Sequence, residues 1–126
     1  MRQIIFLTFI VSTALTSCGQ TKSNRTFLGL DYAKHELLKC KQDKSSKQIL
    51  VDTLIKTQET AIKVAETLLF EIYGEQNIVK QRPYEVYNLE GYWIIKGTLP
   101  KGSLGGTFLI ITNSTNGQVI KLTHGK

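Results

Sequence analysis

The pattern of hydrophobic and polar positions predicts two helices in the first half of the chain and four strands in the second. Apolar residues recur at helical spacing over residues 27–41, and more regularly over residues 57–73. Thr57 suits the N-cap of the second helix, and Gly74 suits its C-terminal cap. Six residues should form the core-facing stripe of this helix: Ala61, Val64, Ala65, Leu68, Leu69 and Ile72.

Apolar runs separated by turn residues predict strands over residues 84–89, 92–98, 107–112 and 118–123. Glu90-Gly91 is a tight turn between the first two strands, and an Asn-Gly turn precedes the last strand. The third strand is apolar on both faces, so we expect it inside the sheet. Ile120 and Leu122 should share one face of the last strand. Residues 49–51 form either a short strand or an extended lead-in to the second helix.

Helices followed by strands with short connections predict the α+β class. We expect one or two N-terminal helices packed on one face of a four-stranded antiparallel meander. Residues 75–81 should be a short connection with one helical turn near residues 77–79.

The segment over residues 92–108 contains the only tryptophan, one of the two prolines and four of the ten glycines. Trp93 should face the core, and Gly97 on the same face leaves room for a neighbour or marks a bulge. Pro100 cannot donate to a strand ladder, so regular pairing should stop there. The glycines that follow permit backbone angles that other residues resist. We assign structural roles to Trp93, Gly97, Pro100, Gly105 and Gly106.

The order Tyr-Trp, Gly-Thr-Leu-Pro, Gly-Gly, apolar strand and Asn-Gly turn resembles that of small bacterial immunity proteins with a nuclear transport factor 2-like fold. The resemblance covers about residues 57–126. It implies a non-enzymatic protein that binds and blocks a cognate protein toxin by occluding it. A cystatin-like wrap of helix and sheet has nearly the same element order and is the alternative fold. The matching segments are residues 61–66, 72–74, 82–84, 92–108, 116–119 and 124–126.

The N-terminus has the pattern of a secretory signal. A short positively charged segment precedes an almost wholly apolar run over residues 4–15. This run is shorter than a typical transmembrane helix. The sequence Leu15-Thr16-Ser17-Cys18 resembles the bacterial lipobox, whose cysteine carries a diacylglyceryl group. We therefore expect a signal peptide over residues 1–17, a lipid-anchored tether over 18–26 and one domain over 27–126. The alternative is an ordinary signal peptide with a chance cysteine.

If Cys18 is acylated, the protein is held in the bacterial cell envelope and faces the periplasm or the cell surface. Its toxin should then act at or outside the inner membrane. The only other cysteine, Cys40, cannot form an internal disulfide, and we expect it to be a small, partly buried residue.

The net charge of +6 falls to +5 once Arg2 is removed with the signal. Such an excess suits an anionic bilayer or an acidic partner. No dense basic patch with interleaved aromatics is present, which argues against nucleic acid. The sequence offers no nucleophile with a histidine base and no cluster of metal ligands. We read Glu66 as part of a solvated helix face and His124 as a surface residue, and we expect no catalysis, cofactor, metal or small-molecule substrate.

Two tyrosines and two residues of the glycine-rich crossing are the candidate partner-binding residues: Tyr84, Tyr87, Lys101 and Leu104. For the tyrosines, the alternative is core packing and cross-strand pairing. For the crossing, the alternative is a plain hairpin loop. The competing function for the whole chain is an envelope ligand-binding or peptidase-modulating domain similar to the PepSY group. An enzyme that uses the cavity of the fold ranks last.

Overall fold

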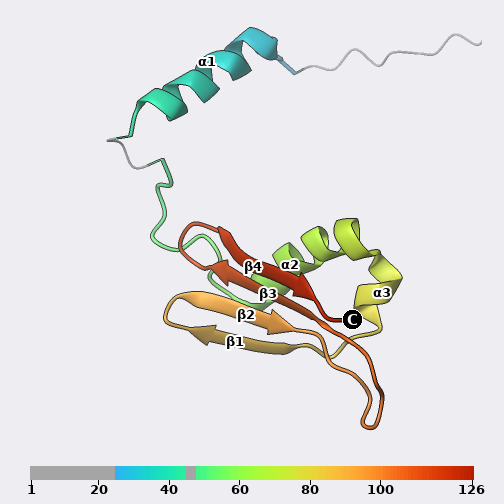
Figure 1. Cartoon of the computed structure of the whole chain (residues 1–126). Helices are drawn as coiled ribbons and strands as arrows, with labels where there is room; N and C mark the ends of the chain where they lie inside the picture. The colour runs from blue at the N-terminus through green and yellow to red at the C-terminus, as the bar shows by residue number, and fades with distance from the viewer. Residues whose placement is uncertain (1–24, 45–47) are drawn as a thin grey trace, which may run out of the picture. The chain divides into compact units, whose positions relative to one another are not determined.

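The computed structural model describes residues 25–44 and 48–126 (Figure 1). The predicted signal peptide, Cys18 and residues 19–24 of the tether lie outside these residues. The chain divides at residue 44 into two compact units, and each is described by itself. Within the described ranges, no helix combines the length and the apolar character needed to cross a membrane.

In its described residues, 25–44, the first unit has one helix, α1 (Gly29–Gln42). It begins two residues later than predicted, at Gly29, which has a positive φ of 80°. Acidic Asp31 lies in its first turn and basic Lys39 in its last, as the helix dipole favours. None of its residues is buried. The expectation that Cys40 is partly buried is therefore wrong, because α1 packs no side chain away from solvent.

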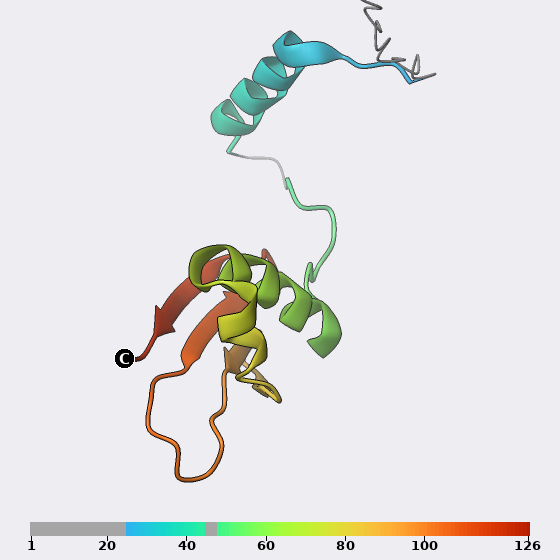
Figure 2. The same ribbon diagram turned by 90° about the vertical axis from the view of Figure 1, so that its right-hand side faces the viewer.

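The second unit has the α+β architecture that the sequence predicts. Its elements are α2 (Gln58–Tyr73), α3 (Glu75–Val79), β1 (Glu85–Leu89), β2 (Tyr92–Lys96), β3 (Phe108–Asn113) and β4 (Val119–His124). The four strands form one antiparallel sheet in the order β1-β2-β3-β4, so β3 lies inside it as expected. The two helices lie on one side of the sheet (Figure 2).

Both predicted caps of α2 are present. The Thr57 hydroxyl accepts the Thr60 N–H at 3.2 Å, and Gly74 ends the helix with a φ of 84°. The buried line of the helix is narrower than predicted. Ala61, Ala65 and Leu69 are buried at a spacing of four, Val64 is half-buried, and Leu68 and Ile72 are exposed. Residues four apart lie on one side of a helix, so this narrow line faces the core and the residues beside it are closer to solvent.

The last strand differs from the predicted alternation because it contains an irregularity. Ile111 pairs with Lys121 and Thr112 pairs with Val119, so Ile120 is an extra residue between them. Val119 and Leu122 both pack on the core, while Ile120 is exposed. The prediction that Ile120 shares a face with Leu122 is wrong because a bulge shifts the alternation by one residue.

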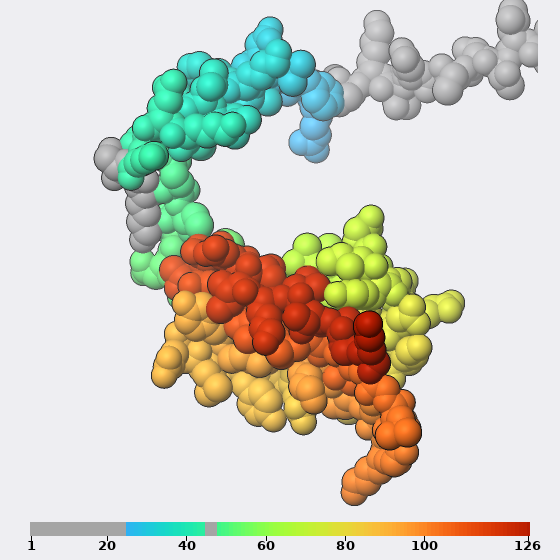
Figure 3. Space-filling view, in the orientation of Figure 1, coloured from blue at the N-terminus to red at the C-terminus, as the bar shows by residue number. Residues whose placement is uncertain are grey.

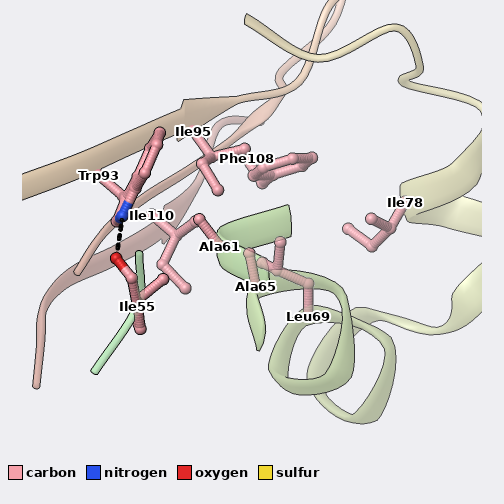
Figure 4. Packing of buried hydrophobic residues seen from close by; sticks show 9 residues of the cluster. All are labelled: Ile55, Ala61, Ala65, Leu69, Ile78, Trp93, Ile95, Phe108 and Ile110. Atoms are coloured by element: carbon pink, nitrogen blue, oxygen red, sulfur yellow. Dashed lines mark hydrogen bonds between the residues drawn. The ribbon is translucent and has the colours of Figure 1, made fainter. Parts of the chain in front are cut away.

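The core lies between α2, α3 and the strands β2 and β3, as Figure 4 shows. Trp93 is 7% exposed, and its indole N–H donates to the Ile55 carbonyl at 2.9 Å (Figure 4). The N–H groups of Leu54 and Ile55 donate to the Ser114 carbonyl. Residues 49–51 form no strand, which rules out the first of the two alternatives predicted for them. The buried cluster is Ile55, Ala61, Ala65, Leu69, Ile78, Trp93, Ile95, Phe108 and Ile110.

Candidate partner-binding surface

Residues 97–107, which join β2 to β3 and are called the finger below, project away from the rest of the second unit (Figures 1 and 3). Its tip is fully open to solvent: Leu104 is 100% exposed, and Lys101 is exposed beside it. Gly102 and Gly105 have φ values of 81° and 146°, a region that side chains resist. The finger therefore presents an apolar and a cationic side chain on a turn that only glycine forms easily.

One end of the finger is fixed by a close approach at Gly97. A Cβ at this position would overlap the side chains of Gln81 and Phe108. The Gly97 N–H donates to the Phe108 carbonyl at 3.0 Å, and the Thr98 N–H donates to the Gln81 carbonyl at 2.9 Å. The Thr98 hydroxyl also donates to the Pro83 carbonyl at 2.8 Å. These contacts hold the start of the finger against the segment after α3.

The other end is fixed by the approach of two glycines. A Cβ at Gly106 would overlap the backbone of Gly125, and the Gly125 N–H donates to the Thr107 carbonyl at 3.0 Å. No residue with a side chain would fit at Gly106 without displacing the chain beside β4. Because both ends are held, the tip is carried by a well-defined base.

Gln81 organises the base of the finger and was missed by the sequence analysis. Its side chain is buried, its Oε1 accepts the Phe108 N–H at 3.0 Å, and its Nε2 donates to the Asn77 carbonyl at 2.9 Å. These two backbone partners determine the orientation of the amide. Gln81 Nε2 therefore also donates to His124 Nε2, which lies 3.1 Å away and accepts the hydrogen bond.

His124 is therefore not the free surface residue that we expected. It is half-buried, its ring lies 5.0 Å from that of Tyr73, and its Nδ1–H donates to the Gly125 carbonyl at 2.7 Å. The reason is that β4 ends next to α3, which brings His124 against Gln81. The histidine joins the end of the chain to the base of the finger.

A pocket of about 410 Å³ opens between the finger, α3 and the end of β4. Its lining mixes leucines of the finger with polar side chains of the helices and of β4, so it suits one side chain of a partner better than an apolar cofactor. The residues are Tyr73, Asn77, Lys80, Gln81, Leu99, Leu104, Gly105, Gly106 and His124. In the part of the chain that the structure describes, no cluster of histidine, cysteine or acidic residues could hold a metal ion.

Tyr84 belongs to a polar cluster between α2 and the start of β1. Glu66 Oε1 accepts from the Tyr84 hydroxyl at 2.8 Å and from two nitrogens of Arg82 at 3.0 and 2.5 Å. Burial and the Glu66 carboxylate raise the pKa of Tyr84 to about 12, and Arg82 opposes this weakly. The Glu66 side chain is only 15% exposed, which corrects its reading as part of a solvated face.

The two candidate tyrosines lie on opposite faces of the sheet. The Tyr84 ring packs edge-on against Phe108 in the core, with 5.1 Å between ring centroids. Tyr87 is 52% exposed and pairs in register with Ile94, on the face away from the helices. Lys101 and Leu104 lie together in the finger. Partner contact by Tyr84, Tyr87, Lys101 and Leu104 stays a prediction.

Residues 60–126 match the model of a protein family described as NTF2 fold immunity protein. Over 77 residues, the chain is 30% identical to the uncharacterized protein YhhH and 35% identical to the uncharacterized protein YbbC, both of Escherichia coli (strain K12). Each alignment covers 60% of this chain and 61% or 63% of the relative, so the chain spans less than two thirds of the length of either. No solved structure matches the chain.

Proposed function

The chain belongs to the NTF2 fold immunity protein family, and from this premise we propose that it binds a cognate bacterial toxin and blocks it without catalysis. Family membership is the observation that carries the proposal, and it favours this function over the PepSY-like alternative. The mechanism is steric occlusion by an interface of ordinary size, about 800 Å² on each partner. Such a mechanism needs a shaped surface and no reacting group.

The finger is the part of the surface best suited to this contact. Leu104 is wholly exposed in the free protein, and full burial of a leucine contributes about 1.5–3 kcal/mol. The tip is carried by two ends that are fixed to the body, so less conformational entropy is lost on binding than for a free loop. Lys101 adds a charge beside the apolar anchor, and the pocket under the finger can receive a side chain of the toxin.

We also propose that the protein is a lipoprotein anchored through Cys18 in the cell envelope. The support is the sequence Leu15-Thr16-Ser17-Cys18 after an apolar run. A diacylglyceryl group carries two acyl chains, which hold a protein at a membrane far more stably than one chain does. The toxin would then be an agent of the envelope, such as a cell-wall hydrolase, a lipase or a pore former. Fractionation of cells that carry Cys18→Ala tests the anchor, and an unchanged membrane fraction would contradict it.

The function is tested with the toxin domain encoded in a neighbouring reading frame. That domain is expressed in the cytosol and, separately, with an export signal, each with and without this protein. Survival of cells that export the toxin is the expected result. Protection against neither form overturns the immunity function, whereas protection against the cytosolic form alone overturns only the envelope location.

A matched pair of variants tests the finger. Leu104→Ser removes the exposed anchor, and Leu50→Ser makes the same change at an exposed leucine of the lead-in before α2. Neither substitution should change the thermal midpoint by much, because both side chains are in water. Leu104→Ser should lower the affinity for the protected toxin at least tenfold, which corresponds to about 1.4 kcal/mol. Equal affinities for the two variants would remove the finger from the interface.

A further inference from the structure

One face of the sheet in the second unit points away from α2 and α3 and is called the outer face here. Its identity follows from the register, because Val86, Ile95, Ile110 and Leu122 pack on the core and their neighbours along each strand point the other way. The outer face consists of Glu85, Tyr87, Leu89, Tyr92, Ile94, Lys96, Leu109, Ile111, Asn113, Lys121 and Thr123.

The centre of the outer face is apolar. Tyr87, Ile94, Ile111 and Lys121 stand side by side in one row across the four strands. Tyr87 and Leu89 are more than half exposed, and both isoleucines are partly exposed. Aromatic and aliphatic side chains in one exposed row are typical of a protein contact surface.

The charged residues of the outer face are Glu85 on β1, Lys96 on β2 and Lys121 on β4. After Glu90 the sequence contains Lys96, Lys101, Lys121 and Lys126 and no aspartate or glutamate. Glu85 lies opposite Lys96 in the register of β1 and β2, so that lysine has an acidic neighbour. Lys121 lies opposite Ile111 and has no acidic residue beside it in the register. The β4 side of the outer face and the finger are therefore positive, and the β1 side is close to neutral.

We propose that the outer face is a second part of the toxin-binding surface, and that it receives an acidic surface of the toxin with an apolar centre. The carboxylates of that surface meet Lys121 and Lys101, and its apolar centre covers the row at Tyr87. This inference rests on the proposed function and adds the chemistry and the orientation of the partner. A second copy of the chain is a poorer occupant, because two net-positive faces would repel each other.

The charge pattern predicts effects on the rate of association. Exposed lysines attract an acidic partner over a distance of about one Debye length, roughly 8–10 Å at physiological salt. Such steering raises the association rate and weakens with salt, while the dissociation rate depends on the buried apolar contacts. Reversal of the two lysines should therefore slow association most at low salt.

The first experiment uses the toxin domain that this protein neutralises. The double variant Lys101→Glu, Lys121→Glu should associate at least about tenfold more slowly at low ionic strength, with a smaller difference at high salt. Lys56→Glu is the matched control, since Lys56 is exposed on the lead-in before α2. An effect of the control equal to that of the double variant, or no effect of the double variant on a complex that the parent forms, overturns the inference.

The second experiment does not need the toxin, so it separates failure of this inference from failure of the proposed function. The probe is a soluble random copolymer of glutamate and tyrosine, which combines carboxylates with aromatic rings. In amide NMR spectra of the full chain, we expect shifts of residues in the outer face and the finger and none along α2. Shifts along α2, or no shifts, overturn the inference. If the outer-face amides shift with the concentration of this protein when no copolymer is present, the outer face binds a second copy of the chain instead.

Discussion

The two faces of the sheet are made by the same four strands, yet one is buried and the other is open to solvent. On the core face, Trp93, Ile95, Phe108 and Ile110 are at most 7% exposed. On the outer face, Tyr87 is 52% exposed. Apolar residues occur on both faces, so hydropathy does not distinguish them. What distinguishes them is that α2 and α3 cover one face only (Figure 2).

The same residue types therefore have different consequences on the two faces. Removal of a core-face side chain should unfold the protein, because the cavity is enclosed by α2. Removal of an outer-face side chain should leave the fold intact and weaken toxin binding.

Trp93→Ala should lower the free energy of unfolding by about 3–5 kcal/mol, the range for loss of a buried aromatic side chain. The substitution also leaves the Ile55 carbonyl without its indole donor. Chemical denaturation measures the change. Trp93→Phe is the control, because it keeps an aromatic ring and should cost clearly less. An unchanged midpoint with lost toxin binding would move Trp93 to the interface and break the comparison.

Gly97→Ala should lower the free energy of unfolding by about 1–3 kcal/mol, as overpacking does. The added methyl group overlaps Gln81 and Phe108 at the base of the finger. Gly102→Ala is the matched control, because a Cβ there meets nothing within 4 Å and only the positive φ of 81° opposes it. We expect about 1–2 kcal/mol for the control. If Gly102→Ala lowers the free energy of unfolding more than Gly97→Ala does, backbone strain at the tip of the finger is more costly than the steric overlap at its base.

Tyr84→Phe should lower the free energy of unfolding at neutral pH by about 0.5–1.5 kcal/mol, because the hydroxyl loses its bond to Glu66. The two proteins should also differ in their dependence on alkaline pH. In the folded state the pKa of Tyr84 is raised to about 12, whereas an unfolded tyrosine titrates near pH 10.

The sign of the alkaline effect follows from proton binding. Between about pH 10 and 12 the unfolded chain has released the Tyr84 proton and the folded chain still holds it, so this group's contribution to stability is complete below pH 10 and declines above it. The parent should therefore lose more stability than Tyr84→Phe over this range. Denaturation at several pH values measures the difference. Parallel curves would contradict a raised pKa of Tyr84 in the folded state.

Tyr87→Ala should change the free energy of unfolding by no more than about 0.5 kcal/mol, as is usual for exposed side chains. It should nevertheless weaken toxin binding, because Tyr87 lies in the exposed apolar row of the outer face. A thermal melt and a binding assay on the same sample test both parts. A large loss of stability would show that the outer face is covered within the folded chain, and the contrast between the faces would then fail.

Features that depend on a few neighbouring residues were predictable from the sequence. Thr57 and Gly74 delimit α2 as predicted, because capping is a local property of the backbone. The turn at Glu90-Gly91, where both φ values are positive, joins β1 and β2 as predicted. The interior position of β3 followed from its apolar character on both faces. Family resemblance in the segment over residues 92–108 pointed to the family whose model matches residues 60–126.

The candidate surface was predictable only in part. The sequence indicated that the crossing over residues 97–107 was long and rich in glycine, but not which groups hold its ends. It paired Tyr84 with Tyr87 as interface candidates, and the structure places them on opposite faces. The cause is the period of two along a strand: the two tyrosines are three positions apart, so Tyr84 points toward Glu66 and the core while Tyr87 points away from them.

The order of the elements, their caps and the turns between the strands can be predicted from the sequence, because they follow from interactions within a few residues. The roles of Gln81, Glu66 and His124 depend instead on the folded arrangement. Each of them is held by groups that lie far from it along the chain: Gln81 by Phe108, Glu66 by Tyr84 and Arg82, and His124 by Gln81. The bulge at Ile120 likewise depends on the pairing of β4 with β3. Contacts of this kind form only when the chain has folded, and hydrophobic periodicity contains no record of them.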